Sequence, residues 1–258
     1  MKLVWKSFSL CKDGNREDEN EDAVSPQLAN GIRINGDRFS CAMSDGATAS
    51  SFSKLWAALL VNEASLSHDM QKDFFLTINN ARMRWKTQLD GNQLTWPAMI
   101  KVRQGAFATL LWFHIWHQNG FPFQQTLSNA RGWTAHAVGD TCLFQVNKGR
   151  FIGSYPLTKA DQFNNTPDLI STNAAYQRIT PGKGNFSGEW QKGDHFLISS
   201  DALAQWIVRK IETNTMTWPM VSENLTSLVR YQTWIRSLRR QGQIKNDDTS
   251  LISISVDD

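Results

Sequence analysis

Several aspartates lie beside apolar, strand-like runs of the sequence. Asp45, Asp140 and Asp201 each follow such a run, Asp247 precedes the last run, and Asp22 closes the acidic stretch Asp18–Asp22. Carboxylates at strand ends stand on the rim of a sheet, where several of them can converge on one point. Converging carboxylates repel one another unless cations lie between them, and oxygen-only ligand sets suit hard ions such as Mg²⁺ or Mn²⁺. The pattern therefore predicts a metal-dependent enzyme.

Taken singly, each aspartate has a simpler interpretation. Asp is a common turn residue, and an acidic run such as Glu17–Asp22 is most often a solvated loop. The joint pattern favours a site, because each carboxylate has a distinctive neighbourhood and the neighbourhoods follow one another in a fixed order.

The composition is that of an ordinary globular protein. Of the 258 residues, 41% are hydrophobic and 20% are charged, which is enough apolar material for a sizeable core. The net charge is +3, with 27 basic and 24 acidic residues interspersed, so neither a nucleic acid nor an anionic membrane is predicted as a partner. The apolar runs are too short to span a bilayer, and the first residues lack the apolar core of a signal peptide. We therefore expect a soluble cytoplasmic protein.

Neither the cysteines nor the histidines indicate a site of their own. The three cysteines lack C-x-x-C spacing, and Cys41 and Cys142 lie in strand-like runs, which predicts buried free thiols in a reducing compartment. His114, His136 and His195 lie in or beside strand-like runs, and we expect them to be core or rim residues instead of metal ligands.

The first part of the chain predicts strands followed by two helices. The dipeptides Asn30-Gly31 and Asn35-Gly36 favour hairpins. After Asp45, apolar residues recur at helical spacing, and Ser50 or Ser51 is the expected cap. A second helix is expected over about residues 69–88.

The remainder returns to strands and ends in helices and a last strand. Residues 104–116 predict a buried strand, and residues 133–146 predict a hairpin around Gly139-Asp140. The polar stretch 151–190 predicts a long excursion, and such excursions are more often functional than idle. Ser222 is the expected cap of a last long helix.

Runs of strands with segregated helices argue for α+β layers, not the βαβ alternation of a parallel sheet. The strands are apolar enough for two packed sheets with helices outside. We therefore expect two sheets in the middle of the molecule.

Six blocks of sequence together resemble a known family. They are Asn20-Glu-Asp-Ala23, Ser44-Asp-Gly46, Gly105-Ala-Phe-Ala-Thr109, Val138-Gly-Asp-Thr141, Ser199-Ser-Asp201 and Asn246-Asp-Asp-Thr249. In this order they resemble the motif series of the metal-dependent, type 2C serine/threonine protein phosphatases, particularly the bacterial variants. The resemblance runs from about residue 7 to the end of the chain.

The resemblance implies one domain over residues 1–258, built as a four-layer αββα sandwich. Two central, mainly antiparallel β-sheets would be flanked by helices, and the excursion at about 151–190 would be a variable flap. The implied activity is hydrolysis of phosphoserine or phosphothreonine in proteins, by water activated at a binuclear Mn²⁺ or Mg²⁺ centre. A phosphorylated protein substrate, paired with a serine/threonine kinase, is the implied partner.

The resemblance also implies roles for individual residues. The metal ligands would be Asp22, Asp45, Gly46 (through its carbonyl), Asp201 and either Asn246 or Asp247, and Asp140 with Asp201 would form a weaker third metal site. Glu21 would accept a hydrogen bond from metal-bound water, and Arg16 would bind the substrate phosphate.

The chain departs from the family pattern at four places. Thr48 stands where a second glycine is common, and Ala47 stands where some members carry a histidine. Glu17 occupies the usual place of the phosphate-binding arginine, one residue after Arg16. Asn246 aligns with the last metal aspartate, and Asp247 is the preferred substitute for it. Two alternatives stay open: a pseudophosphatase that binds phosphoproteins without turnover, and a hydrolase of small phosphorylated metabolites.

Overall fold

A computed structural model of the chain describes residues 1–26, 31–48, 50–67, 70–90, 95–117, 131–164, 166–177 and 184–257. Two β-sheets form its centre, and every pairing between their strands is antiparallel. The six-stranded sheet has the order β3 (Ile32–Asn35), β1 (Lys2–Leu10), β13 (Thr249–Asp257), β12 (His195–Ser199), β8 (Cys142–Asn147) and β9 (Arg150–Tyr155). The five-stranded sheet has the order β11 (Asn185–Glu189), β7 (Arg131–Val138), β6 (Leu110–His117), β4 (Arg38–Asp45) and β2 (Asp22–Ser25).

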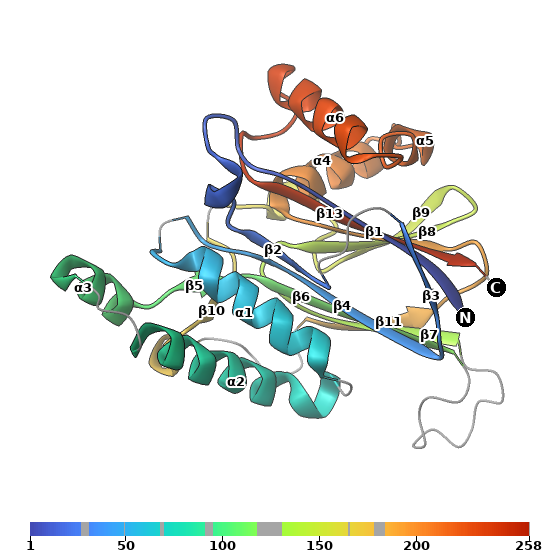
Figure 1. Cartoon of the computed structure of the whole chain (residues 1–258). Coiled ribbons are helices and arrows are strands. Elements are labelled where there is room, and N and C mark those ends of the chain that lie inside the picture. Colours follow the sequence, from blue (N-terminus) through green and yellow to red (C-terminus); the bar gives the residue numbers. More distant parts are fainter. Residues whose placement is uncertain are drawn as a thin grey trace.

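Helices cover the outer face of each sheet (Figure 1). On the five-stranded sheet lie α1 (Ser53–Leu66) and α2 (Met70–Asp90), followed by α3 (Trp96–Gln104) at its edge. On the six-stranded sheet lie α4 (Asp201–Glu212), α5 (Pro219–Ser222) and α6 (Leu228–Arg240). The four-layer αββα sandwich expected from the sequence is therefore confirmed. No helix in the described part of the chain is long and apolar enough to cross a membrane.

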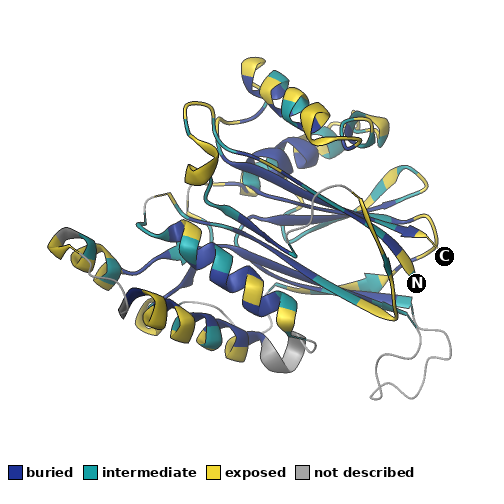
Figure 2. Ribbon diagram, viewed as in Figure 1, coloured by how far each residue is buried: buried dark blue, intermediate teal, exposed yellow. Residues whose placement is uncertain are grey.

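The layers follow from the alternation of side chains along the strands, which point in turn to the two faces of a sheet. In β13, Ile252, Ile254 and Val256 lie in the cluster between the two sheets, whereas Leu251 packs beneath the outer helices. Figure 2 shows that the strands are buried along most of their length while the helices expose their outer sides. The expected burial of the Cys41 and Cys142 thiols is also confirmed.

Two predicted hairpins are wrong, because the chain crosses between the sheets at these turns. After Asn35-Gly36 the chain passes from β3, which pairs with β1, to β4, which pairs with β2 and β6. At Gly139-Asp140 it passes from β7 in one sheet to β8 in the other. Turn residues favour a reversal of the chain, but they do not decide which sheet the next strand joins. Asn30, in the other predicted turn, lies outside the described residues.

The predicted strand over residues 104–116 begins later than expected. Helix α3 occupies the preceding residues, with Pro97 in its first turn, and Gly105 at φ 82° ends it. Two short strands follow: β5 (Phe107–Ala108), which pairs with β10 (Ile170–Ser171), and then β6. The helix is short, which leaves little periodicity to read from the sequence.

The excursion at 151–190 contains more regular structure than its composition indicates. Its last strand, β11, extends the five-stranded sheet, and β10 pairs with β5. Short 3₁₀ turns lie at Ala160–Gln162 and Ala174–Tyr176.

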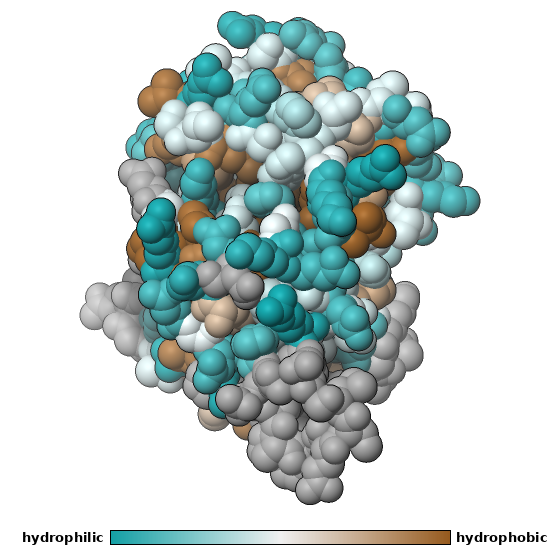
Figure 3. All heavy atoms as spheres, turned by 90° about the vertical axis from the view of Figure 1, so that its right-hand side faces the viewer, coloured by the Kyte–Doolittle hydropathy of each residue, from teal (hydrophilic) through white to brown (hydrophobic). Residues whose placement is uncertain are grey.

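Both termini lie at one end of the sandwich (Figure 1), and the strand register places the ends of β1, β4 and β12 and the start of β13 at the opposite end. The face that carries the termini is mainly hydrophilic, with hydrophobic residues scattered among the polar ones (Figure 3). The aspartates singled out in the sequence lie at or next to the strand ends of the other end.

The cap of the last long helix is Ser227, not Ser222. The Ser227 hydroxyl accepts a hydrogen bond from the backbone N–H of Arg230 at 3.2 Å, whereas Ser222 lies in the short helix α5. We expect Ser227→Ala to lower the free energy of unfolding by about 1 kcal/mol, because a helix N–H loses its partner. Urea denaturation measures the change. Ser222→Ala is the matched control, and an equal loss in both variants would contradict the assignment.

Candidate functional site

The strand register brings five aspartates to the end of the sandwich opposite the termini. Thr249 pairs with Leu10 at the end of β1, so Asp247 lies just beyond that end. Asp201 follows β12 at the same end, because Ser199 pairs with Leu251. On the other sheet, Asp22 and Asp45 are direct partners across β2 and β4. Asp140 lies in the crossing from β7 to β8.

Asp22 and Asp45 form an unfavourable pair without a cation. Side chains directly opposite one another on neighbouring strands are in close contact, and like charges in such positions are destabilising. Both carboxylate oxygens of Asp22 are buried and have no hydrogen-bond partner. An ionised carboxylate in this state costs much more free energy than a satisfied one.

The titration behaviour of these two groups reflects the same conflict. Burial is the main cause that raises the pKa of Asp22 to about 8, and the charges of Asp248 and Asp201 raise it further. The hydroxyls of Ser250 and Ser200 act in the opposite direction from nearby, although neither makes a hydrogen bond of normal geometry with Asp22. The pKa of Asp45 is raised well above its ordinary value, first by burial and then by Asp22, Asp201, Asp140 and Asp247.

Asp140 and Asp201 belong to the same electrostatic cluster. Burial raises the pKa of Asp140 to about 7 and that of Asp201 to about 6, and the carboxylate of Asp247 adds to both shifts. The ammonium group of Lys245 partly opposes both. All five carboxylates therefore interact, and the positive charge of Lys245 acts on two of them, Asp140 and Asp201.

Serine hydroxyl groups lie near the carboxylate of Asp22. On β13, Ser250 shares the inner face with the buried Ile252 and Ile254, so this face changes from apolar to polar at the aspartate end. The Ser250 hydroxyl lies 2.8 Å from that of Ser9, and the backbone N–H of Ser250 donates to the Ser200 hydroxyl at 2.9 Å. These serines were not among the site residues predicted from the sequence, although their position at strand ends near the aspartates was a usable signal.

Thr109 joins three of the sequence blocks. Its hydroxyl accepts a hydrogen bond from the backbone N–H of Asp45 at 2.9 Å and lies 2.8 Å from the hydroxyl of Thr141. Its own N–H donates to the carbonyl of Asp45 at 2.8 Å. Gly139 packs on this threonine so closely that a Cβ would lie 2.6 Å from Thr109 Cγ2. The blocks around residues 45, 109 and 140 are thus one packed unit.

Glu21 fixes the loop that follows Asp45. Its carboxylate accepts hydrogen bonds from the hydroxyls of Thr48, at 2.7 Å, and Ser53. The Lys12 ammonium lies 3.8 Å from the same carboxylate. Gly46 has no room for a side chain, since a Cβ would lie 2.9 Å from Ser53. Thr48, at the position of the family's second glycine, therefore has a structural partner, and both oxygens of Glu21 are engaged by this loop.

Arg16, predicted to bind phosphate, is exposed and faces acidic neighbours. Its Nε lies 3.2 Å from the carboxylate of Asp18 and 3.7 Å from that of Glu19, and 76% of its side chain is accessible. Surface ion pairs of this kind are weak. Arg16 is therefore held only loosely in its present position.

Asn246 and Asp247, which the sequence could not separate, point to different neighbours. Asn246 Oδ1 accepts from the N–H of Asp13 at 2.7 Å, and Asn246 Nδ2 donates to the carbonyl of the same residue at 3.1 Å. This double contact needs a donor and an acceptor, which asparagine has and an ionised aspartate lacks. Asp247 raises the pKa values of Asp45, Asp140 and Asp201. Asp248 accepts from the N–H groups of Lys12 and Glu21, and so ties the last block to the β1–β2 connection.

The ligand types of the cluster suit divalent cations, although the described side chains are not arranged as a complete coordination site. Within the described ranges, no group of three His, Cys, Asp or Glu side chains is arranged to hold a metal ion. The unpartnered oxygens of Asp22, the oxygen-only donor set and the excess of negative charge nevertheless match the preferences of Mg²⁺ and Mn²⁺. Such ions commonly keep several water ligands, so a few carboxylates suffice.

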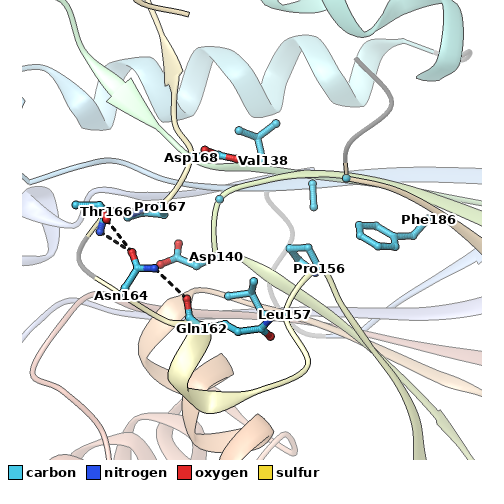
Figure 4. Close-up of a pocket in the computed structure, with 13 residues that line it drawn as sticks. Val138, Asp140, Pro156, Leu157, Gln162, Asn164, Thr166, Pro167, Asp168 and Phe186 are labelled. Atoms are coloured by element: carbon cyan, nitrogen blue, oxygen red, sulfur yellow. Dashed lines mark hydrogen bonds between the residues drawn. The ribbon is translucent and has the colours of Figure 1, made fainter. Parts of the chain in front are cut away.

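A cavity of about 420 Å³ opens beside Asp140 (Figure 4). Asp140, Pro156, Leu157, Asn164 and Phe186 are among the residues that line it. The Asn164 side chain accepts hydrogen bonds from the N–H and hydroxyl of Thr166 at 2.8 and 3.1 Å, which fixes this part of the excursion. The excursion therefore provides a wall next to the carboxylate cluster.

Comparison with known proteins gives a match at the level of structure. No family model matches the sequence, and neither does any curated protein. Among solved structures, the Mycobacterium tuberculosis serine/threonine phosphatase PstP/Ppp is similar over 100% of both chains, with a TM-score of 0.60 and 12% sequence identity. The chain has the type 2C phosphatase fold. The S. agalactiae serine/threonine phosphatase aligns with a TM-score of 0.60 at 13% identity, over 99% of this chain and 100% of that one.

One of the similar structures was solved with metal. The catalytic domain of PstP in complex with two manganese ions aligns with a TM-score of 0.58 and 15% identity, over 99% of this chain and 100% of that one. At these identities the likeness shows a shared type 2C phosphatase fold, and it does not by itself show a shared activity.

The raised pKa values predict how the stability of the metal-free protein depends on pH. A carboxyl whose folded-state pKa is raised is protonated more readily in the folded chain, so folding is favoured at low pH and loses stability as the pH rises. For Asp22 the loss extends from the ordinary Asp pKa of 3.8 to about 8. We expect the melting temperature in EDTA to fall across the upper part of this window, and saturating Mn²⁺ to reverse the trend.

The variant Asp22→Asn tests the source of this trend. It removes one buried charge, so at the alkaline end it should melt roughly 2–4 °C higher than the wild type in EDTA for each kcal/mol recovered. Asp161→Asn, a change of an exposed residue in the 3₁₀ turn Ala160–Gln162, is the control and should leave the profile unchanged. Parallel profiles for the wild type and Asp22→Asn would contradict the assignment.

Proposed function

We propose that the protein is a metal-dependent serine/threonine protein phosphatase. The observation that carries the proposal is the gathering of five carboxylates at one end of a type 2C phosphatase fold, with Asp22 directly opposite Asp45 and without hydrogen-bond partners. Carboxylates in this arrangement are stable in the ionised form only with cations between them. The predicted residence in the cytoplasm and the predicted pairing with a kinase belong to the same proposal.

The proposed ligands are Asp22, Asp45, Asp201 and Asp247, with the carbonyl of Gly46 and, for a weaker site, Asp140. When bound there, Mn²⁺ or Mg²⁺ would neutralise charge on the phosphoryl group and make water more acidic. The chain's own residues keep this end rigid: Thr109 holds the backbone of Asp45, and Glu21 holds the loop after Gly46. Positioning and charge neutralisation are most of what phosphoryl transfer requires.

The proposed substrate is a phosphorylated segment of a protein, lying along the open end of the sandwich. The cavity beside Asp140 is the proposed binding site for the substrate residues that flank the phosphoserine or phosphothreonine, because it adjoins the carboxylate cluster. Lys245 is the proposed contact for the phosphate, since its charge reaches Asp140 and Asp201 whereas Arg16 pairs with Asp18 and Glu19.

One observation favours the alternative of a pseudophosphatase. Arg16, the phosphate-binding candidate from the family pattern, is directed to Asp18 and Glu19 and is largely exposed. A protein that binds phosphoserine peptides tightly without releasing phosphate would support this second function.

Activity measurements decide between the two. Purified protein with Mn²⁺ should release phosphate from an aryl phosphate and from phosphoserine peptides, and EDTA should stop the reaction. Asp45→Asn should lower kcat by at least about 100-fold, because a central carboxylate and its charge are lost. Asp161→Asn should retain wild-type kcat. Absence of metal-dependent release together with absence of Mn²⁺ binding by calorimetry would refute the proposal.

The pair Asp247→Asn and Asn246→Asp tests which residue of the last block contributes to the centre. We expect Asp247→Asn to weaken Mn²⁺ binding by about 10- to 100-fold, because a carboxylate of the cluster is neutralised. Asn246→Asp adds a charge but loses the donor to the Asp13 carbonyl, so it should lower stability without strengthening Mn²⁺ binding. Calorimetric titration measures both, and tighter Mn²⁺ binding by Asn246→Asp would reverse the assignment.

A further inference from the structure

Helix α6 buries an arginine against the carboxylate end of the sandwich. Only 3% of the Arg239 side chain is accessible, while its neighbour Arg240 is exposed. A guanidinium group remains charged under all ordinary conditions, and its removal from water is costly unless its donors are satisfied. The position therefore calls for an explanation beyond helix packing.

The contacts of Arg239 join three separate segments. Nη1 donates to the carbonyl of Cys11 at 2.9 Å and to the carboxylate of Asp13 at 3.1 Å. Nη2 donates to the carbonyl of Asp247 at 2.5 Å and to the hydroxyl of Thr249 at 3.1 Å. Nη2 also donates to the carbonyl of Leu10 at 3.5 Å, whereas Nε has no hydrogen-bond partner. The guanidinium thus holds together the end of β1 with the residues that follow it and the start of β13.

The same segments are joined a second time through Asp13. The backbone of Asp13 holds the side chain of Asn246 by two hydrogen bonds, and its carboxylate accepts from Arg239. Asp247 is therefore fixed from both sides, by Asn246 before it in the chain and by the arginine at its own carbonyl.

We infer that Arg239 is a positioning residue that fixes Asp247 at the carboxylate cluster. The inference rests on the proposed function, since the group that it serves is a proposed metal ligand. Three acceptors of Arg239 are backbone carbonyls, those of Leu10, Cys11 and Asp247, so its contacts determine where the chain lies beside the cluster. The planar fork explains the choice of arginine, because one guanidinium can reach two backbone segments at once and an ammonium cannot.

The experiment measures Mn²⁺ affinity in folded variants. By calorimetry, Arg239→Met should bind Mn²⁺ about 10- to 100-fold more weakly than the wild type, the usual effect of losing a group that orients a ligand. Arg239→Lys keeps the charge but not the fork, so it should lie between the two. Arg240→Met removes an exposed arginine one position away and should bind as the wild type does.

The melting temperature of each variant in EDTA separates positioning from stability. If Arg239→Met does not fold, Arg239→Lys carries the test alone. Folded variants that bind Mn²⁺ with wild-type affinity, whatever their melting temperature, would overturn the inference and leave the proposed function intact. A wild-type protein that does not bind Mn²⁺ would instead refute the proposed function.

Discussion

The mutual repulsion of buried carboxylates is the constraint on which this end of the molecule depends. Asp22 and Asp45 face each other across two paired strands, and the charges of Asp140, Asp201 and Asp247 act on Asp45 as well. Each of these carboxylates would be more stable in its ionised form if it were exposed to water. Their position is instead dictated by two sheets whose apolar inner faces pack together and so bring the strand ends into register. The core thus imposes the unfavourable cluster, and the polar neighbours of the cluster limit its cost.

Those polar neighbours do not neutralise the charge. Ser200 and Ser250 lower the pKa of Asp22 only in part, and Lys245 acts on Asp140 and Asp201 from outside the cluster. Hydrogen bonds are directed mainly at backbone groups, as in the contact between Thr109 and the N–H of Asp45. Such an arrangement fixes the positions of the carboxylates. Asp201 and Asp247 each accept one backbone N–H, while both oxygens of Asp22 have no hydrogen-bond partner and can accept a cation, as in the proposed preorganised ligand set.

The sequence was informative where a single local rule determines the structure. Strand-end positions of Asp45 and Asp201 follow from apolar runs that stop at a carboxylate, and the layered fold follows from the segregation of strands and helices. The sequence-based prediction was wrong where two different structures are compatible with the same local sequence pattern. Gly139-Asp140 has the composition of a hairpin turn, yet Gly139 is required because a Cβ would collide with Thr109 of the neighbouring strand segment. Contacts such as that of Ser9 with Ser250 join residues far apart in the chain, so local patterns in a single sequence do not reveal them.

The departures from the family pattern also become intelligible through such contacts. Thr48 makes a hydrogen bond to Glu21, and Asn246 makes a donor–acceptor pair with Asp13 that aspartate could not make. These two hydrogen bonds explain Asn246 better as a residue that fixes the last sequence block, residues 246–249, than as a weakened metal ligand. In the proposed metal centre, the residue type at position 246 then matters less than how firmly Asp247 is held. That firmness comes from helix α6, on the outside of the six-stranded sheet, through the guanidinium of Arg239. The outer layer of the sandwich thereby takes part in shaping the site between the sheets.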